Sequence, residues 1–263
     1  AGATVPAAVS VPGWACISLT GGGKMAETAE KAGTPRPLYT YRAAITKGEA
    51  IRYISHLDYA DMMQRAICRA KLPAAYSEGF NPHLKIAFAS ALAVGVTSEA
   101  EYMDFELMQA IPPEEVGSRL RQELPAGVEL RRLRLLTGRP EALMAQVDQA
   151  DYEITLPCAD EVGAKKAVQA FNEATECLYR RSTPKKSRDI EVKQYVKGDV
   201  ALSWEAGTAR LAVAIRITPT GSIKPGEILS VLTRQFAFPG ESALASLHRR
   251  ALRHDGQSLI DLD

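Results

Sequence analysis

The sequence predicts an α+β fold of two ferredoxin-like halves in tandem, each with the order β-α-β-β-α-β and an antiparallel sheet covered by helices. Two observations lead to this prediction. From residue 38 onward, the apolar residues switch between the spacing of a strand and that of a helix. The chain also has 263 residues, 46% hydrophobic and 24% charged, which suits one large core or two modest ones and excludes a disordered or fibrous chain.

The first half begins with a strand at residues 39–46 and a helix with a recognisable start. Ser55 opens this helix and Asp58 follows three residues later, a short-acid form of the capping box. Apolar residues then recur at helical spacing, at Tyr59, Met63, Ile67 and Ala70. The pattern therefore predicts a strand followed by a capped helix.

Three more strands and a second helix complete the first half. The strands are predicted at residues 85–92, 102–107 and 128–136, and the helix at residues 113–124. In the second of these strands, Met103, Phe105 and Leu107 alternate with acidic residues, as in a strand with one buried face. The helix is predicted from apolar residues at helical spacing, which are Val116, Leu120 and Leu124.

The second half is predicted in the same way. A strand at 151–157 and a helix at 159–173 are followed by extended segments at 178–182, 200–204 and 210–217. Pro225 suits the first turn of a last helix, because the N–H that proline lacks has no partner there. Ile228, Leu229 and Leu232 follow it at helical spacing.

Residues 1–37 differ in composition, being rich in Ala, Gly, Thr and Pro with a second Met at position 25, and are predicted to be a disordered or non-native extension. Residues 38–137 and 151–263 form the two halves, joined by a linker at 138–150. Residues 5–19 are mildly apolar, but they hold two prolines and follow no basic residue, so neither a signal peptide nor a membrane span is predicted. We therefore expect a cytoplasmic protein without a membrane partner.

The four cysteines indicate no metal centre. Cys16, Cys68, Cys158 and Cys177 form neither a C-x-x-C pair nor a three-cysteine cluster for an iron–sulfur centre or structural zinc. The acidic residues at 99, 101 and 104 are interpreted as a solvated sheet edge rather than as metal ligands. The sequence therefore predicts no metal and no cofactor.

Local clusters of basic residues indicate a phosphate-bearing partner in a chain whose 32 Lys and Arg nearly cancel 31 Asp and Glu. The strongest cluster opposes seven basic residues to Asp189 and Glu191, with Tyr179 and Tyr195 as stacking groups; the seven are Arg180, Arg181, Lys185, Lys186, Arg188, Lys193 and Lys197. A second cluster is His248, Arg249, Arg250, Arg253 and His254, and a third is Arg131, Arg132 and Arg134. The alternative is that these residues form ordinary solvated faces.

The loop before residue 85 is interpreted as a binding loop. Asn81 and Pro82 are turn formers, and Gly79 is expected to have a positive φ. The other loop residues with binding chemistry are Phe80, His83 and Lys85.

Two interpretations of the histidines stay open. In the first, Ser55 and Asp58 cap the helix, His56 lies in its first turn, and His83 is a half-buried structural residue. In the second, His56 and His83 meet in one cleft as acid and base, Asp58 orients an imidazole, and Lys85 attracts a phosphate or carboxylate.

Several segments resemble the radical-SAM-linked bacterial family of the DUF2344 type. The resemblance spans roughly residues 38–253 and rests on the segments 54–58, 77–83, 88–92 with Gly95, 98–104 and 221–225. It implies a radical SAM protein, encoded nearby or fused, as partner, but it supplies no reaction. This chain lacks the three-cysteine cluster of a radical SAM enzyme, so it is expected to act beside one. Leu84 stands where the family's loop usually has a second proline.

Three functions remain open on the sequence. The first is an accessory partner of a radical SAM enzyme that binds tRNA or rRNA for modification or maturation, since tandem ferredoxin-like sheets carry RNA in the tRNA pseudouridine synthases. Its phosphate contacts would come from the 180–197 cluster, Lys85, Arg249 and Arg250. The second is an RNA-modifying or RNA-cleaving enzyme that uses His83 and His56. The third is a protein-interaction module that binds no nucleic acid.

Overall fold

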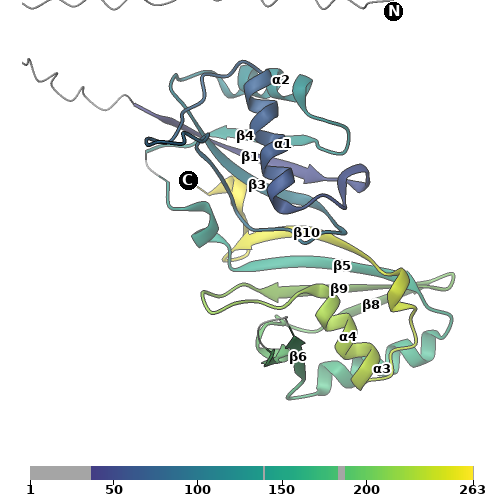
Figure 1. Cartoon of the computed structure of the whole chain (residues 1–263). Helices are drawn as coiled ribbons and strands as arrows, with labels where there is room; N and C mark the ends of the chain where they lie inside the picture. The colour runs from purple at the N-terminus through teal and green to yellow at the C-terminus, as the bar shows by residue number, and fades with distance from the viewer. Residues whose placement is uncertain (1–36, 139, 183–186, 263) are drawn as a thin grey trace, which may run out of the picture. The chain divides into compact units, whose positions relative to one another are not determined.

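The computed structural model describes residues 37–138, 140–182 and 187–262, which form a mixed α/β fold with a large, mostly antiparallel sheet and four α-helices (Figure 1). The helices are α1 (His56–Arg69), α2 (Pro113–Glu123), α3 (Glu161–Glu173) and α4 (Pro225–Gln235). The strands are β1 (Tyr39–Lys47), β2 (Ile86–Phe88), β3 (Val96–Leu107), β4 (Leu130–Leu135), β5 (Gln149–Pro157), β6 (Leu178–Ser182), β7 (Ser187–Glu191), β8 (Ala201–Glu205), β9 (Thr208–Arg216), β10 (Ser246–His254) and β11 (Gln257–Ser258). The predicted class of helices with antiparallel strands is confirmed at this level.

One sheet runs through both parts of the described chain. Its strand order is β4-β1-β3-β10-β5-β9-β8, with β2 paired to β3 and β11 paired to β10. β10 pairs parallel to β3, with Leu247 opposite Val96, and antiparallel to β5, with Arg249 opposite Tyr152. β10 therefore joins the strands of the first part to those of the second. β6 and β7 form a separate hairpin.

The helix start predicted at Ser55 is confirmed in atomic detail. The Ser55 hydroxyl accepts a hydrogen bond from the Asp58 N–H at 3.1 Å, and the Asp58 carboxylate accepts one from the Ser55 N–H at 3.3 Å. Tyr59, Met63 and Ile67 of the same helix are buried, as their spacing predicts. A capping box depends on residues three apart, so local sequence suffices to locate it.

Two strand predictions are corrected. The strand expected at 85–92 is only three residues long, Ile86–Phe88, and the chain then leaves the sheet edge. β10 was not predicted as a strand, because His248, Arg249 and Arg250 interrupt any apolar alternation. Its charged side chains are neutralised by acids on neighbouring strands, which the spacing of residues along one segment does not reveal.

Two buried clusters hold the described elements together. The first packs α1 and α2 against β1 and β3. The second packs α3 and α4 against β5 and β9, and it includes Leu143 and Val147 from the stretch interpreted as a linker.

The C-terminal turn at residues 259–261 is tied to β1. The guanidinium of fully buried Arg42 donates to both Asp104 carboxylate oxygens at 2.9 Å and to the Leu259 carbonyl at 2.9 Å. Asp104 is therefore buried in an ion pair, which corrects the expectation of a solvated edge.

Residues 1–36, which hold Cys16, lie outside the described residues, as do Arg139, Lys185 and Lys186. The predicted extension and two members of the strongest basic cluster are therefore not located. Within the described ranges, none of the helices has both the length and the apolar character needed to cross a membrane.

Candidate functional site

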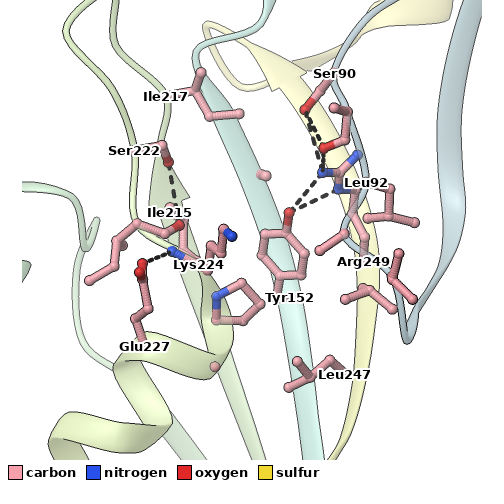
Figure 2. Close-up of a pocket in the computed structure, with 18 of the residues that line it drawn as sticks. Ser90, Leu92, Tyr152, Ile215, Ile217, Ser222, Lys224, Glu227, Leu247 and Arg249 are labelled. Carbon is pink, nitrogen blue, oxygen red and sulfur yellow. Dashed lines mark hydrogen bonds between the residues drawn. The ribbon is translucent and has the colours of Figure 1, made fainter. Parts of the chain in front are cut away.

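A pocket of about 540 Å³ lies where the start of α4 faces β5, β9, β10 and the segment before β3 (Figure 2). Segments far apart in sequence meet there. They include parts of 88–92 and 221–225, two of the segments on which the family resemblance rests. Most of its wall is apolar, and the larger apolar residues are Leu92, Val94, Val96, Ile215, Ile217, Ile223 and Leu247. The polar groups are few: Ser90, Tyr152, Arg181, Ser222, Lys224, Glu227 and Arg249. A concave apolar site with a few converging polar groups is the usual form of a small-ligand site.

Tyr152 and Arg249 form the buried polar side of the pocket. Arg249 donates to the Tyr152 hydroxyl from Nε at 3.0 Å and from Nη2 at 2.8 Å. Its Nη1 donates to Glu101 Oε1 at 2.9 Å, and the arginine is 2% exposed. Burial opposes the charge, but Glu101 and Tyr152 together raise the pKa of Arg249 above its ordinary value. Arg249 is therefore a fixed cation behind the tyrosine.

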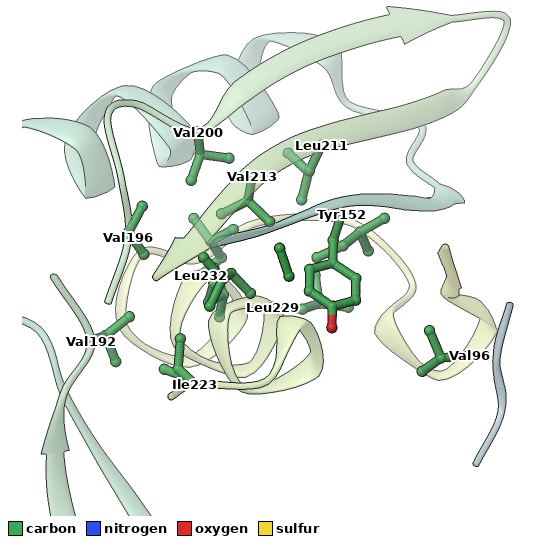
Figure 3. Packing of buried hydrophobic residues seen from close by; sticks show 14 of the residues in the cluster. Val96, Tyr152, Val192, Val196, Val200, Leu211, Val213, Ile223, Leu229 and Leu232 are labelled. Carbon is green, nitrogen blue, oxygen red and sulfur yellow. The ribbon is translucent and has the colours of Figure 1, made fainter. Parts of the chain in front are cut away.

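The Tyr152 hydroxyl keeps one hydrogen-bonding function unused. It accepts twice from Arg249, and no acceptor for its own proton occurs among the residues that the structure describes. Tyr152 is 9% exposed and belongs to the same buried cluster as Leu211, Val213 and Leu229 (Figure 3). Because Tyr152 lines the pocket, this proton is available to a ligand there.

Arg181 and Glu227 join the β6–β7 hairpin to the start of α4. The Glu227 carboxylate accepts from Arg181 Nε at 2.6 Å, from its Nη2, and from the Lys224 backbone N–H at 2.8 Å. Arg181 Nη2 also donates to the Ser222 carbonyl at 3.1 Å. Hydrogen bonding to Glu227 is the main cause that raises the pKa of Arg181. These hydrogen bonds therefore attach the β6–β7 hairpin to the wall of the pocket at the start of α4.

Two further arginines of the strongest basic cluster are exposed on this hairpin. Arg180 is opposite Asp189 in the ladder, and Arg188 is opposite Arg181. Gly221, at the beginning of the pocket segment, has a φ of +140°, and a Cβ there would lie 3.8 Å from Arg188 Nη2. Arg180 and Arg188 thus lie on the hairpin that supplies Tyr179 and Arg181 to the pocket.

The other basic residues of these clusters, where the structure describes them, have partners elsewhere in the chain. Lys193 donates to the Phe171 and Asn172 carbonyls at the end of α3, at 2.9 and 3.1 Å. Arg250 pairs with Glu99 and Glu153 at 3.0 and 3.1 Å. Other charge or hydrogen-bond pairs are Lys85–Glu106, Lys197–Gln149, Arg131–Glu129, Arg132–Asp261 and Arg253–Asp151. Of the predicted basic residues, the structure brings Arg180, Arg181, Arg188 and Arg249 to the pocket or its hairpin.

The two candidate catalytic histidines are in separate surroundings, and no contact between their rings occurs in the described part of the chain. The His56 ring meets Phe88 edge-on with 5.3 Å between ring centroids. His83 Nδ1 lies 2.9 Å from the Ser77 hydroxyl. Asp58 serves the helix cap. Burial is the largest cause lowering the pKa of His56 below 6.5; Glu101 opposes this shift, while Lys47 and Arg249 add to it.

The loop at 77–83 is closed by its own hydrogen bonds. The Ser77 N–H donates to the His83 carbonyl at 2.8 Å, and the His83 N–H donates to the Ser77 hydroxyl at 3.1 Å. Gly79 has a φ of +118°, which confirms the predicted positive φ. Phe80 is fully exposed between Gly79 and the Asn81-Pro82 pair. In the described ranges, no group of three or more His, Cys, Asp and Glu side chains is arranged to hold a metal ion.

Sequence reasoning missed Tyr152, Lys224 and Glu227 as site residues and assigned Glu101 to a solvated edge. Glu101 is 2% exposed, which corrects that assignment. A signal was present, because Glu101 shares its odd position with Met103, Phe105 and Leu107 of β3, whose side chains belong to the first core cluster. For Tyr152 and Lys224, nothing in the local sequence indicates a shared pocket.

Residues 40–225 match the family DUF2344, described as an uncharacterized protein conserved in bacteria. No curated protein matches the sequence. In fold, the chain is similar to part of a crystal structure of a Cbf5-Nop10-Gar1 complex, with 12% identity and a TM-score of 0.43. That likeness covers 80% of this chain and 48% of the other, so this chain spans about half its length.

A second fold likeness is to a crystal structure of an unknown protein from Galdieria sulphuraria, with 13% identity and a TM-score of 0.24. It covers 83% of this chain and 99% of the other. Likenesses of this size support no functional conclusion.

Proposed function

We propose that this chain, which belongs to the DUF2344 family of uncharacterized proteins conserved in bacteria, binds RNA as a non-catalytic partner of a radical SAM protein encoded nearby or fused to it. The observation that carries the RNA proposal is the position of the β6–β7 hairpin. It exposes Arg180 and Arg188, while its Tyr179 and Arg181 line the pocket. Exposed arginines beside a concave site suit an RNA strand whose phosphates contact the arginines while one of its nucleotides enters the pocket.

The charge balance supports a local rather than a whole-surface attraction to RNA. Most basic residues of the predicted clusters that the structure describes pair with acids or donate to carbonyl or amide oxygens, as described above. Arg188 faces Arg181 across the hairpin, and Arg181 is itself paired with Glu227. The positive charge that remains exposed near the pocket therefore belongs mainly to Arg188 and Lys224, and Arg180 adds charge on the other face of the hairpin, opposite Asp189. A small patch of this kind positions a backbone and reads no sequence.

We also propose that the two parts of the fold are ferredoxin-like halves in tandem. The strand orders β4-β1-β3-β2 and β10-β5-β9-β8 support this, because each follows the sequence fourth, first, third, second among the strands of its part. The hairpin β6–β7 would then be an insertion in the second half that carries the RNA-binding arginines.

Binding of fluorescein-labelled single-stranded RNA and of tRNA to the purified full chain tests the proposal. In the Arg180→Glu/Arg188→Glu variant, we expect affinity to fall by about tenfold or more, and the salt dependence to weaken by about two phosphate contacts. Arg69→Glu/Arg119→Glu is the matched control, because it makes the same charge change at surface pairs on α1 and α2, outside the predicted basic clusters. Equal losses in the two variants, or no binding by the wild type, would overturn the RNA proposal.

Two measurements then separate the remaining parts of the proposal. Crosslinking in the native cells, followed by sequencing of the attached RNA, would identify tRNA or rRNA, with the hairpin variant as background. Co-purification with the radical SAM protein of the same genome tests the partnership. Phe80→Ser is expected to weaken it, since Phe80 is a fully exposed aromatic side chain, whereas Val162→Ser on α3 is the control. Absence of co-purification would refute the partnership alone.

A further inference from the structure

We infer that the pocket binds a single nucleotide, with its phosphate at Lys224 and the start of α4 and its base beside Tyr152; its source in RNA rests on the proposed function. The volume of about 540 Å³ falls within the roughly 300–1,000 Å³ of small-ligand sites. Tyr152 and Tyr179 are the aromatic residues of the wall, and the rest is largely aliphatic. Such a wall suits a flat ring better than a strongly hydrated group.

The unused proton of Tyr152 selects ligands with a hydrogen-bond acceptor. The hydroxyl is held in place by two hydrogen bonds from Arg249, so its own proton is directed away from the guanidinium. A purely apolar ligand would leave this buried donor unpaired. The carbonyl oxygens and ring nitrogens of nucleobases are acceptors of the required kind.

The wall of the pocket formed by the start of α4 favours an anionic group. Arg181 is paired with Glu227 and Arg249 with Glu101, so these charges largely cancel. The Lys224 ammonium has no ion pair within the described residues and lies exposed at the pocket (Figure 2). Pro225 has no N–H, and the Gly226 N–H in the first turn of α4 has no partner in the same part of the chain. One free cation beside a free N–H at a helix start favours a phosphate.

A nucleotide combines a ring that carries hydrogen-bond acceptors with an anionic phosphate. The hairpin adds a further phosphate-binding group beside the pocket. Arg188 lies near Gly221, three residues before Lys224, so a phosphate next to the bound one would reach exposed arginine. A nucleotide turned out of a single strand therefore satisfies the pocket and the hairpin together. A free nucleotide would satisfy the pocket alone.

Titration of the full chain with AMP, GMP, CMP, UMP, uridine and inorganic phosphate, followed by ligand-observed NMR, tests the inference. We expect at least one monophosphate to bind, and uridine and phosphate each to bind about tenfold more weakly or not at all. Leu247→Trp, which fills the pocket, and Lys224→Glu should each weaken binding by about tenfold or more. Lys166→Glu on the exposed face of α3 is the charge control. Val94→Trp blocks the pocket from an exposed position if Leu247→Trp does not fold.

The outcomes distinguish the inference from the proposed function. Monophosphate binding that the pocket variants abolish supports the inference, and competition by the monophosphate against RNA shows that the bound unit comes from RNA. Monophosphate binding without RNA binding supports the pocket and refutes the RNA function. RNA binding that neither pocket variant changes, with no monophosphate binding, overturns the inference. Binding of aromatic carboxylates with equal affinity overturns it too.

Discussion

Arg249 and Arg250 are consecutive in β10, yet their guanidinium groups lie on opposite faces of the sheet. The Arg249 side chain is 3% exposed and pairs with Glu101, whereas the Arg250 side chain is 50% exposed and bridges Glu99 and Glu153. The pairing with β5 explains this separation. Arg249 lies opposite Tyr152, whereas Arg250 falls in the register shift between Arg249 and Ala251 and pairs with Glu153, the next residue of β5, whose side chain points to the other face from Tyr152. Two residues that look equivalent in the sequence therefore contribute differently to stability and to the pocket.

Replacement of these two arginines is expected to have unequal effects. Arg249→Gln leaves the Glu101 carboxylate buried without its partner, which should lower the free energy of unfolding by about 3–5 kcal/mol. Arg250→Gln breaks only surface pairs and should lower it by at most about 1 kcal/mol. Urea unfolding of both variants measures the difference. Equal losses would contradict the buried position of Arg249.

Tyr152→Phe is expected to destabilise the protein while the aromatic ring stays in place. The buried Arg249 loses the acceptor of two hydrogen bonds, so the free energy of unfolding should fall by about 1–3 kcal/mol. Tyr39→Phe is the control, because the Tyr39 hydroxyl makes no hydrogen bond in the described chain and its loss should change stability by less than about 0.5 kcal/mol. Denaturant unfolding that finds the two variants equally stable would be inconsistent with this geometry.

His56 is expected to make stability pH-dependent on the acidic side of neutrality. Its pKa is lowered in the folded protein, chiefly by burial, so the unfolded chain binds more protons near and below pH 6.5. The contribution is complete above about pH 6.5 and is lost as the pH falls through the lowered folded-state pKa. Unfolding measured from pH 7.5 to pH 5.5 should therefore show a smaller loss of stability in His56→Gln than in the wild type. An NMR titration placing the His56 pKa at or above 6.5 would refute this prediction.

Gly240→Ala is expected to overpack the second core. A Cβ at this position would lie 2.6 Å from Phe238 Cε1 and 2.8 Å from Leu156 Cδ1, and both side chains are buried. The free energy of unfolding should fall by about 1–3 kcal/mol. Gly226→Ala is the control, since its nearest neighbour, Leu247 Cδ1, is 3.8 Å away. Thermal unfolding distinguishes the two variants. An unchanged melting temperature for Gly240→Ala would contradict the predicted overpacking.

Local patterns predicted the helices and most strands, because their determinants are close in sequence. The Ser55–Asp58 capping box, the buried positions of α1 and the positive φ of Gly79 each depend on a few neighbouring residues. The local pattern does not predict β10, because its charged side chains pair with acids in β3 and β5 that are about 100 to 150 residues away in sequence. A charged strand in the middle of a sheet has no local signature.

The sequence by itself determined the positions of the helices and of most strands, the buried face of α1, and that no segment carries a three-cysteine cluster. Only the tertiary structure decided which basic residues stay available for a ligand. Arg249, Arg253 and Lys193 belong to basic runs in the sequence, yet the two arginines pair with the distant acids Glu101 and Asp151, and Lys193 donates to the Phe171 carbonyl. The pocket also exists only after β10 inserts between β3 and β5. Sheet register and long-range packing select charge partners, and these are properties of the folded chain rather than of any short segment.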